Sequence, residues 1–193
     1  MINETYASVC WLRYKKNCDI VCTEIGYQWM MDACGISLNH QGEIEDIIEI
    51  EVKTNIADLR RDFEKKEQKH IDYSEGKKCP NYMYYVVPET LADFAKDYLE
   101  TKNKSYGLMK FDPSYLDRTR YPWGFAESLT SVSKCKRLTK DVPKIINLHM
   151  AVRRLQNEYF MQRHVITNHI SSINENIRYM AKEMEGIQVS DDI

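Results

Sequence analysis

The sequence contains no apolar run that approaches the roughly 18 residues of a membrane-spanning helix, so we expect no membrane segment. Its N-terminus, MINETYASVCWLRYKK, lacks the charged-then-apolar pattern of a secretion signal, which favours a cytoplasmic protein. The net charge of −2 provides no overall basic field, so a nucleic-acid site would have to be a local basic patch.

The cysteines form no CxxC pair and no cluster with histidine at zinc-finger spacing, which argues against a structural zinc site. We expect reduced, mostly buried thiols, as in a cytosolic protein. With 193 residues, 43% of them hydrophobic and 29% charged, the chain is long enough for one globular domain, alone or with an appendage.

Apolar periodicity predicts an α/β domain over residues 1–142. The first three strands are expected to form a meander. In the helix after residue 55 we expect Ile56, Leu59, Phe63 and Ile71 to face the core and the charged residues to face out. The expected order is a helix over 3–16, strands over 19–27, 29–38 and 45–53, a helix over 55–71, a strand over 80–88, a helix over 89–100, and strands over 106–111 and 128–139.

Residues 143–193 are predicted to be a helical extension. Apolar residues recur there at mostly three- and four-residue steps, and one Gly and one Pro lie between Val142 and the end. Two arrangements fit this pattern equally: a coiled coil that forms a homodimer, and a helical hairpin folded back on the domain.

Glu49, Glu51 and Lys53 alternate with apolar residues in the strand over 45–53, so all three point to one face. An exposed strand face with a salt bridge would also give this pattern. However, Asp32 stands in the otherwise uncharged strand over 29–38. If the turn-rich NHQGE joins these strands as antiparallel neighbours, Asp32 lies beside Glu51.

Two converging carboxylates are a natural oxygen site for Mg²⁺, with Mn²⁺ as a substitute. A neighbouring lysine can orient or deprotonate a water, or stabilise charge on a phosphate. The set Asp32, Glu51 and Lys53 therefore predicts metal-dependent phosphodiester chemistry.

The order Asp32…Glu51-Val52-Lys53, with a helix before it and a helix and strand after it, resembles the PD-(D/E)XK nuclease superfamily. The stretch EVKTNIADLRRDFEKKEQKHIDY followed by YMYYVVPE is similar to the MmcB-like DNA-repair nucleases, and the similarity covers about residues 19–139. It implies a restriction-endonuclease-like core (helix, three strands, helix, strand) with extra strands before the helical extension. Met31 stands where the superfamily name has proline.

The resemblance also implies roles for particular residues. Asp32 and Glu51 would bind the metal, Lys53 would be catalytic, and a further acid would join them, with Glu24 preferred over Glu4. Lys69 and Tyr73 resemble the Gln-x-x-x-Tyr pair of related exonucleases and would bind substrate, with lysine in place of glutamine.

A local basic and aromatic segment, DRTRYPWGF, is the expected DNA contact. Between Lys110 and Lys144 eight basic residues stand against four acidic ones, and Arg118 and Arg120 are interleaved with aromatic residues suited to base stacking. The alternative is a solvated loop that happens to be aromatic.

The sequence thus predicts a cytoplasmic, Mg²⁺-dependent deoxyribonuclease of DNA repair, restriction or phage nucleic-acid metabolism. The alternatives are a catalytically inactive nuclease-fold module that binds DNA or a protein partner through its helical tail, and a structural subunit whose long helices are the functional part.

Overall fold

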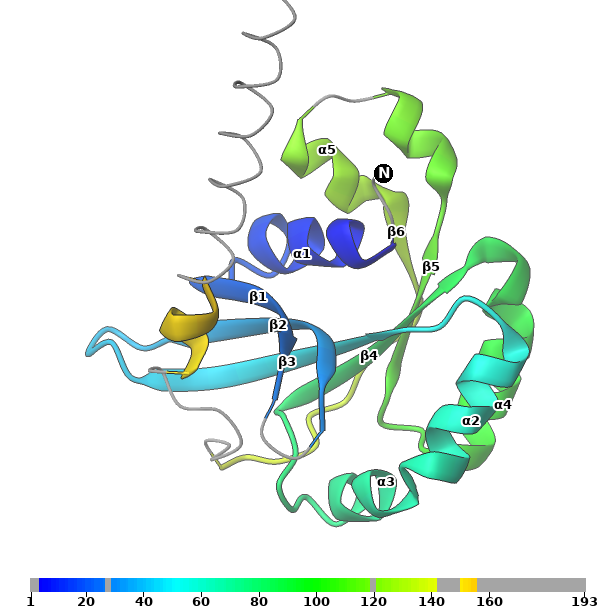
Figure 1. Cartoon of the computed structure of the whole chain (residues 1–193), viewed down its shortest axis with the longest axis horizontal. Coiled ribbons are helices and arrows are strands. Elements are labelled where there is room, and N and C mark those ends of the chain that lie inside the picture. Colours follow the sequence, from blue (N-terminus) through cyan, green and yellow to red (C-terminus); the bar gives the residue numbers. More distant parts are fainter. Residues whose placement is uncertain (1–3, 27–28, 119–120, 142–149, 156–193) are drawn as a thin grey trace, which may run out of the picture. The chain divides into compact units, whose positions relative to one another are not determined.

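The computed structural model describes residues 4–26, 29–118, 121–141 and 150–155 (Figure 1). The chain divides into two compact units, Met1–Ala151 and Val152–Ile193, and the fold below is that of the first. Its described part is α/β, with helices packed on a six-stranded sheet. The elements are α1 (Glu4–Tyr14), β1 (Ile20–Ile25), β2 (Met31–Leu38), β3 (Ile44–Val52), α2 (Ile56–Lys65), α3 (Glu67–Ser74), β4 (Tyr82–Pro88), η1 (Glu89–Leu91), α4 (Ala92–Lys102), β5 (Gly107–Phe111), η2 (Pro113–Arg118), α5 (Pro122–Phe125), η3 (Ala126–Ser128) and β6 (Leu129–Ser133).

Strand order in the sheet is the same as strand order in the chain. The first three strands pair antiparallel, which confirms the predicted meander. β4 pairs parallel to β3 and β5 parallel to β4, and β6 returns antiparallel to β5. Parallel neighbours need a crossover connection, and α2 with α3 provides it between β3 and β4.

The turn between β2 and β3 has the chemistry that its sequence predicts. The side-chain oxygen of Asn39 accepts hydrogen bonds from the backbone N–H groups of Gln41 (3.0 Å) and Glu43 (2.9 Å). Gly42 adopts a φ of 80°, which glycine does at low cost. A fixed turn sets the pairing register of the strands it joins.

The sheet separates two apolar clusters, with α1 on one side and α2, α3 and α4 on the other (Figure 1). The cluster under α1 includes Leu12, Ile50 and Val86. The opposite cluster joins Phe63 of α2 to Tyr85 of β4 and to residues of α4.

Several details differ from the sequence predictions. The helix after residue 55 is two helices, because Lys66 leaves helical geometry (φ −114°, ψ 34°). Ile56 and Ile71 are 41% and 42% exposed, and the charged residues Asp62 and Lys69 are buried instead. The last strand ends at Ser133, well short of residue 139.

The predicted helical extension falls mainly on residues 142–149 and 156–193, which lie outside the described residues, as does the choice between dimer and hairpin. Residues 150–155 are helical. Within the ranges that the structure covers, no helix is both long and apolar enough to cross a membrane.

Candidate active site

The pairing of β2 with β3 brings Asp32 next to Glu51. Ala33 pairs with Ile50, so Asp32 and Glu51 occupy the next positions of the same ladder. The Oδ2 atom of Asp32 accepts a hydrogen bond from the backbone N–H of Val52 at 2.7 Å. Burial and the nearby charge of Glu51 raise the pKa of Asp32 above its ordinary value.

The acidic face of β3 is buried. Glu49, Glu51 and Lys53 are 0%, 1% and 6% exposed, so the interpretation of this pattern as an exposed strand face is wrong. Glu49 pairs with Met83 and Glu51 with Tyr85 on β4, so the acids extend the row of side chains that forms the core under α2 and α4. Buried charges of this kind are costly unless each is paired.

Three lysines supply that pairing at Glu51. The Nζ of Lys53 lies 2.8 Å from Oε2, and the Nζ of Lys69 lies 2.5 Å from Oε1. The Nζ of Lys66 contacts both oxygens, at 3.2 and 3.3 Å. Burial works to raise the pKa of Glu51, but the charges of Lys69, Lys53 and Lys66 outweigh it and lower the pKa below its ordinary value.

Asp62 of α2 is the second acid around which these lysines gather. Its Oδ1 lies 2.8 Å from the Nζ of Lys66 and 3.2 Å from the Nζ of Lys53. Its Oδ2 accepts a hydrogen bond from the hydroxyl of Tyr85 at 2.6 Å and lies 3.4 Å from Nε2 of His70. Although burial opposes it, the close approach of His70 and the lysine charges hold the pKa of Asp62 well below its ordinary range.

Lys69 and Tyr73, the predicted substrate-binding pair, face inward. They are 0% and 2% exposed. The Nζ of Lys69 bridges Glu49 (2.6 Å) and Glu51, and the hydroxyl of Tyr73 donates a hydrogen bond to Glu49 at 2.7 Å. Because neither polar group reaches solvent, the geometry favours positioning of the glutamates over direct contact with a substrate.

We call these seven residues the charged cluster: Asp32, Glu49, Glu51, Lys53, Asp62, Lys66 and Lys69.

The predicted third metal ligand does not join this cluster. Glu24 of β1 falls opposite Asp32 between the pairs Thr23–Ala33 and Ile25–Met31, but it adopts a φ of 48° and is exposed. In the part of the chain that the structure covers, no three His, Cys, Asp or Glu side chains lie close enough to hold one metal ion. The other candidate, Glu4, begins α1, which packs on the opposite face of the sheet.

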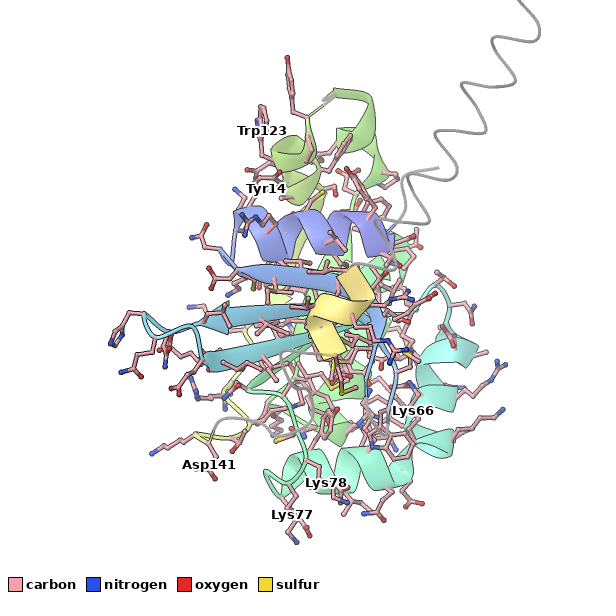
Figure 2. The ribbon with its side chains drawn as sticks, turned by 60° about the vertical axis from the view of Figure 1, so that its left-hand side comes forward. Tyr14, Lys66, Lys77, Lys78, Trp123 and Asp141 are labelled. Atoms are coloured by element: carbon pink, nitrogen blue, oxygen red, sulfur yellow. The ribbon has the colours of Figure 1, made fainter. Side chains whose placement is uncertain are left out.

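The aromatic segment after η2 lies away from the cluster. The exposed rings of Tyr121 and Trp123 stack at 4.5 Å with an interplanar angle of 6°. Tyr121 immediately precedes α5 and Trp123 lies within it. The helix α5 packs on α1, and Figure 2 shows Trp123 and Lys66 on opposite sides of the sheet. Arg120 lies outside the described residues, and Arg118 is the last residue of η2.

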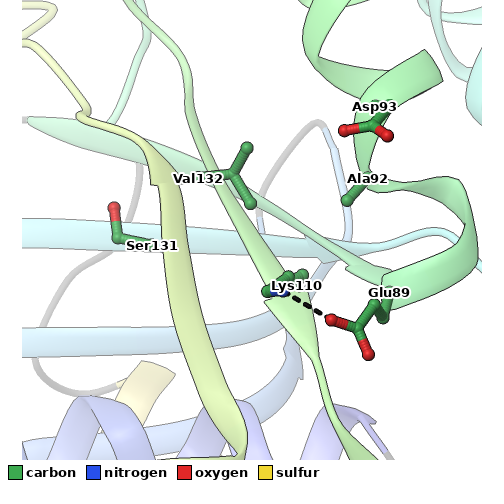
Figure 3. A pocket seen from close by; sticks show the side chains of 6 residues that line it. All are labelled: Glu89, Ala92, Asp93, Lys110, Ser131 and Val132. Carbon is green, nitrogen blue, oxygen red and sulfur yellow. Dashed lines mark hydrogen bonds and ion pairs between the residues drawn. The ribbon is translucent and has the colours of Figure 1, made fainter.

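A hollow of about 340 Å³ lies elsewhere, between η1, the start of α4 and the β5–β6 edge (Figure 3). An ion pair between Lys110 and Glu89 spans it at 2.5 Å. None of the charged cluster lines it.

Glu49, Asp62 and Lys66 are the cluster members to which sequence reasoning gave no role. Asp62, Lys66, Lys69 and Tyr73 follow one another at steps of four, three and four, which is the spacing of one helix face. A charged stripe at that spacing, next to a strand with buried acids, could have indicated a helix that turns its charges inward.

No protein-family model and no curated protein matches the chain. Among solved structures it is similar to an SPO1766 protein of unknown function from Silicibacter pomeroyi, at 16% sequence identity and a TM-score of 0.37. The match covers 89% of this chain and 84% of that one. This likeness is too low for a fold or a function to be inferred from it.

The donors at Asp32 and Glu51 fit a hard divalent cation. Both are carboxylates on adjacent strands, and Mg²⁺ takes one or two protein carboxylates and keeps several waters. Both oxygens of Glu51 are, however, engaged by lysine ammonium groups, so a metal would have to replace at least one of them.

Proposed function

We propose that this chain is a metal-dependent nuclease that hydrolyses DNA phosphodiester bonds at the charged cluster. The observation that carries the proposal is the placement of Asp32 beside Glu51 on neighbouring strands, with the ammonium of Lys53 2.8 Å from Glu51. The element order from α1 to β4, with α2 and α3 in the place of one helix, supports the restriction-endonuclease-like core that the sequence resemblance implies. We assign the protein to the cytoplasm and to DNA repair, restriction or phage nucleic-acid metabolism.

Asp32 and Glu51 would hold the metal, which is Mg²⁺ or Mn²⁺. When bound, the metal would polarise the scissile phosphate and lower the pKa of a water ligand. Lys53 places a buried positive charge beside Glu51, where it can stabilise the negative charge that develops on the phosphate.

Lys69 and Tyr73 act in this proposal as positioning residues. Lys69 fixes Glu51 through an ion pair, and Tyr73 fixes Glu49, which shares the same lysine. The Tyr121–Trp123 stack would be a separate DNA contact, since it lies on the α1 side of the sheet. Arg118 and Arg120 remain predicted DNA contacts in that segment.

One observation favours the second candidate, a catalytically inactive nuclease-fold module acting through its helical tail. Apart from Asp32, the cluster is balanced in charge, with Glu49, Glu51 and Asp62 against Lys53, Lys66 and Lys69. A balanced cluster can persist without any metal.

Cleavage assays separate the two candidates. The purified chain would be incubated with linear, circular and single-stranded DNA, each with Mg²⁺, with Mn²⁺ and with EDTA. An active nuclease cleaves only when metal is supplied, whereas the inactive module cleaves nothing and gains no thermal stability from metal.

The decisive variant is Lys53→Met, which keeps most of the side-chain volume. We expect a rate about 10²–10³ lower, because one preorganised charge is removed from the transition state. Lys65→Met, at an exposed neighbouring position, is the matched control. From the sequence alone, loss of Lys53 should leave the fold almost intact. Its two buried ion pairs, with Glu51 and Asp62, instead indicate a destabilised variant. The assay should therefore be run well below the melting temperature of the variant. Wild-type cleavage by Lys53→Met, free of host nucleases, would refute the catalytic role.

A further inference from the structure

Lys66 lies on the oxygens that a metal would need. Its ammonium contacts both oxygens of Glu51 and, at 2.8 Å, Oδ1 of Asp62. Three carboxylate oxygens from two elements thus surround one cation. This is the kind of oxygen environment in which a hard divalent cation binds.

Of the three lysines, Lys66 is the one with access to solvent. Its side chain is 28% exposed, against 8% for Lys53 and 0% for Lys69. Its backbone leaves helical dihedral angles between α2 and α3, although its N–H still donates to the carbonyl of Asp62 at 2.9 Å. Because its side chain is partly exposed, the ammonium can reach solvent by rotation of the side chain alone, whereas Lys69, at 0% exposure, has no such path.

The charge of Lys66 also acts on Asp32. Burial and the charge of Glu51 raise the pKa of Asp32 above its ordinary value. The backbone hydrogen bond from Val52 and the charges of Lys53 and Lys66 act in the opposite direction without cancelling the rise. The ammonium of Lys66 is therefore within electrostatic reach of both proposed metal ligands and in direct contact with one of them.

We propose that the ammonium of Lys66 and the catalytic metal compete for Glu51, so that Lys66 sets how tightly the site binds metal. The inference rests on the proposed function, since it concerns the same site. Three ammonium groups already share the two oxygens of Glu51, so a divalent cation at this carboxylate would add repulsion that is relieved when one ammonium leaves. A metal ion bound at Glu51 would take the place of Lys66, which has the most access to solvent of the three lysines. Asp62 retains Lys53, Tyr85 and His70 as partners after Lys66 has left.

The test is a titration of the full chain with Mn²⁺ and with Mg²⁺, followed by thermal denaturation. Stabilisation by a ligand that binds the native state follows RT ln(1 + [L]/Kd), so the titration yields an apparent Kd without any activity measurement. We expect Lys66→Gln to bind metal about tenfold more tightly than the wild type, because one competing charge has been removed. Lys65→Gln removes the same charge from an exposed neighbouring position and should bind metal as the wild type does.

Two further variants separate competition from a general charge effect. Lys66→Arg keeps the positive charge and should bind metal no more tightly than the wild type. Lys53→Gln removes a charge that lies closer to Glu51, at 2.8 Å, but has little access to solvent, and it should tighten binding less than Lys66→Gln does.

The outcomes distinguish this inference from the nuclease proposal. Equal Kd values for the wild type and Lys66→Gln, with metal still stabilising both, would overturn the competition and leave the nuclease proposal standing. Equal tightening in Lys66→Gln and Lys53→Gln would also overturn it. If metal stabilises none of the proteins, including Lys66→Gln, both proposals fail.

Discussion

The two faces of β3 are both buried at its centre, but one presents isoleucines there and the other glutamates. Ile48 and Ile50 pack into the apolar cluster under α1, whereas Glu49 and Glu51 meet lysines from the α2–α3 crossover. Apolar burial contributes free energy in proportion to area, at about 25 cal/mol per Å², and tolerates small changes of shape. Buried ion pairs contribute little net stability, yet loss of a single partner is costly.

The difference between the two faces indicates that the charged face has a functional role. Apolar residues on the charged face would stabilise the sheet as well as the ion pairs do, so stability alone does not account for seven charged residues there. Four variants test the comparison, ordered by the size of their expected effect on stability.

Lys69→Met should have the largest effect. It leaves Glu49 and Glu51 buried with one fewer cation, and we expect the free energy of unfolding to fall by about 3–5 kcal/mol in urea denaturation. Ile50→Val on the opposite face is the control, at about 0.5–1.5 kcal/mol. A cost for Lys69→Met no larger than that of Ile50→Val would remove the contrast between the faces.

Glu51→Gln should destabilise the fold by about 1–3 kcal/mol at pH 7, because three lysines lose their shared carboxylate. From the sequence alone, Glu51→Gln should stabilise the protein, because it relieves the repulsion between two crowded carboxylates. The ion pairs with three lysines reverse that expectation. Because the pKa of Glu51 is lowered in the folded state, its ionised form stabilises the fold at pH values above the unfolded pKa of about 4.3. This contribution is lost as the pH falls through the lower pKa of the folded state. The difference between variant and wild type should therefore shrink below about pH 4. A constant difference from pH 7 to pH 2.5 would contradict this.

Asp32→Asn should do the reverse and stabilise the metal-free protein by about 0.5–1 kcal/mol at pH 7. Burial and Glu51 raise the pKa of Asp32, so its ionised form is disfavoured in the folded state. The asparagine oxygen can still accept the hydrogen bond from Val52. At low pH Asp32 is protonated in both the folded and the unfolded protein. The gain in stability should therefore vanish below the unfolded pKa of about 3.9. Thermal denaturation at pH 7 and pH 3 measures it, and a loss of stability at pH 7 would show that Asp32 is a structural ion-pair partner.

Trp123→Ala should have the smallest effect, less than about 0.5 kcal/mol, because the side chain is 56% exposed. If the Tyr121–Trp123 stack binds DNA, the free energy of binding to single-stranded DNA should weaken by about 1–3 kcal/mol in a fluorescence titration. Tyr14→Ala, at another exposed aromatic of the α1 side, is the control. Unchanged affinity would support the alternative of a solvated aromatic loop.

Local patterns were enough to predict the strands that carry Asp32 and Glu51. Alternation with period two identifies β3, and the Asn39–Gly42 turn chemistry identifies its antiparallel neighbour, so their proximity follows from short-range rules. Such rules cannot say whether the acids of β3 are exposed. That depends on how the α2–α3 crossover docks, which is a contact between elements.

The remaining errors have similar causes. The positive φ of Glu24 is a backbone irregularity that no side-chain pattern reveals. The last strand ends at Ser133, and the chain beyond it makes isolated backbone hydrogen bonds outside β5, from Lys136 to Ser105 and from Leu138 to Asn81. The break at Lys66 goes with inward-facing charges on both sides of it, and its sequence, EKKEQK, contains only good helix formers.

The crossover between β3 and β4 also sets when the charged cluster can form during folding. Paired residues of the β1–β2–β3 meander are at most 17 positions apart (Ala33–Ile50), whereas β3 pairs with β4 across 34 positions (Ile48–Tyr82), and the cluster has all its partners only when Tyr85 of β4 reaches Asp62. Interactions absent from a folding transition state act on the unfolding rate and leave the folding rate almost unchanged. We therefore expect the cluster to assemble late and open early, so its ion pairs set how long the native state survives and have little influence on how quickly it is reached.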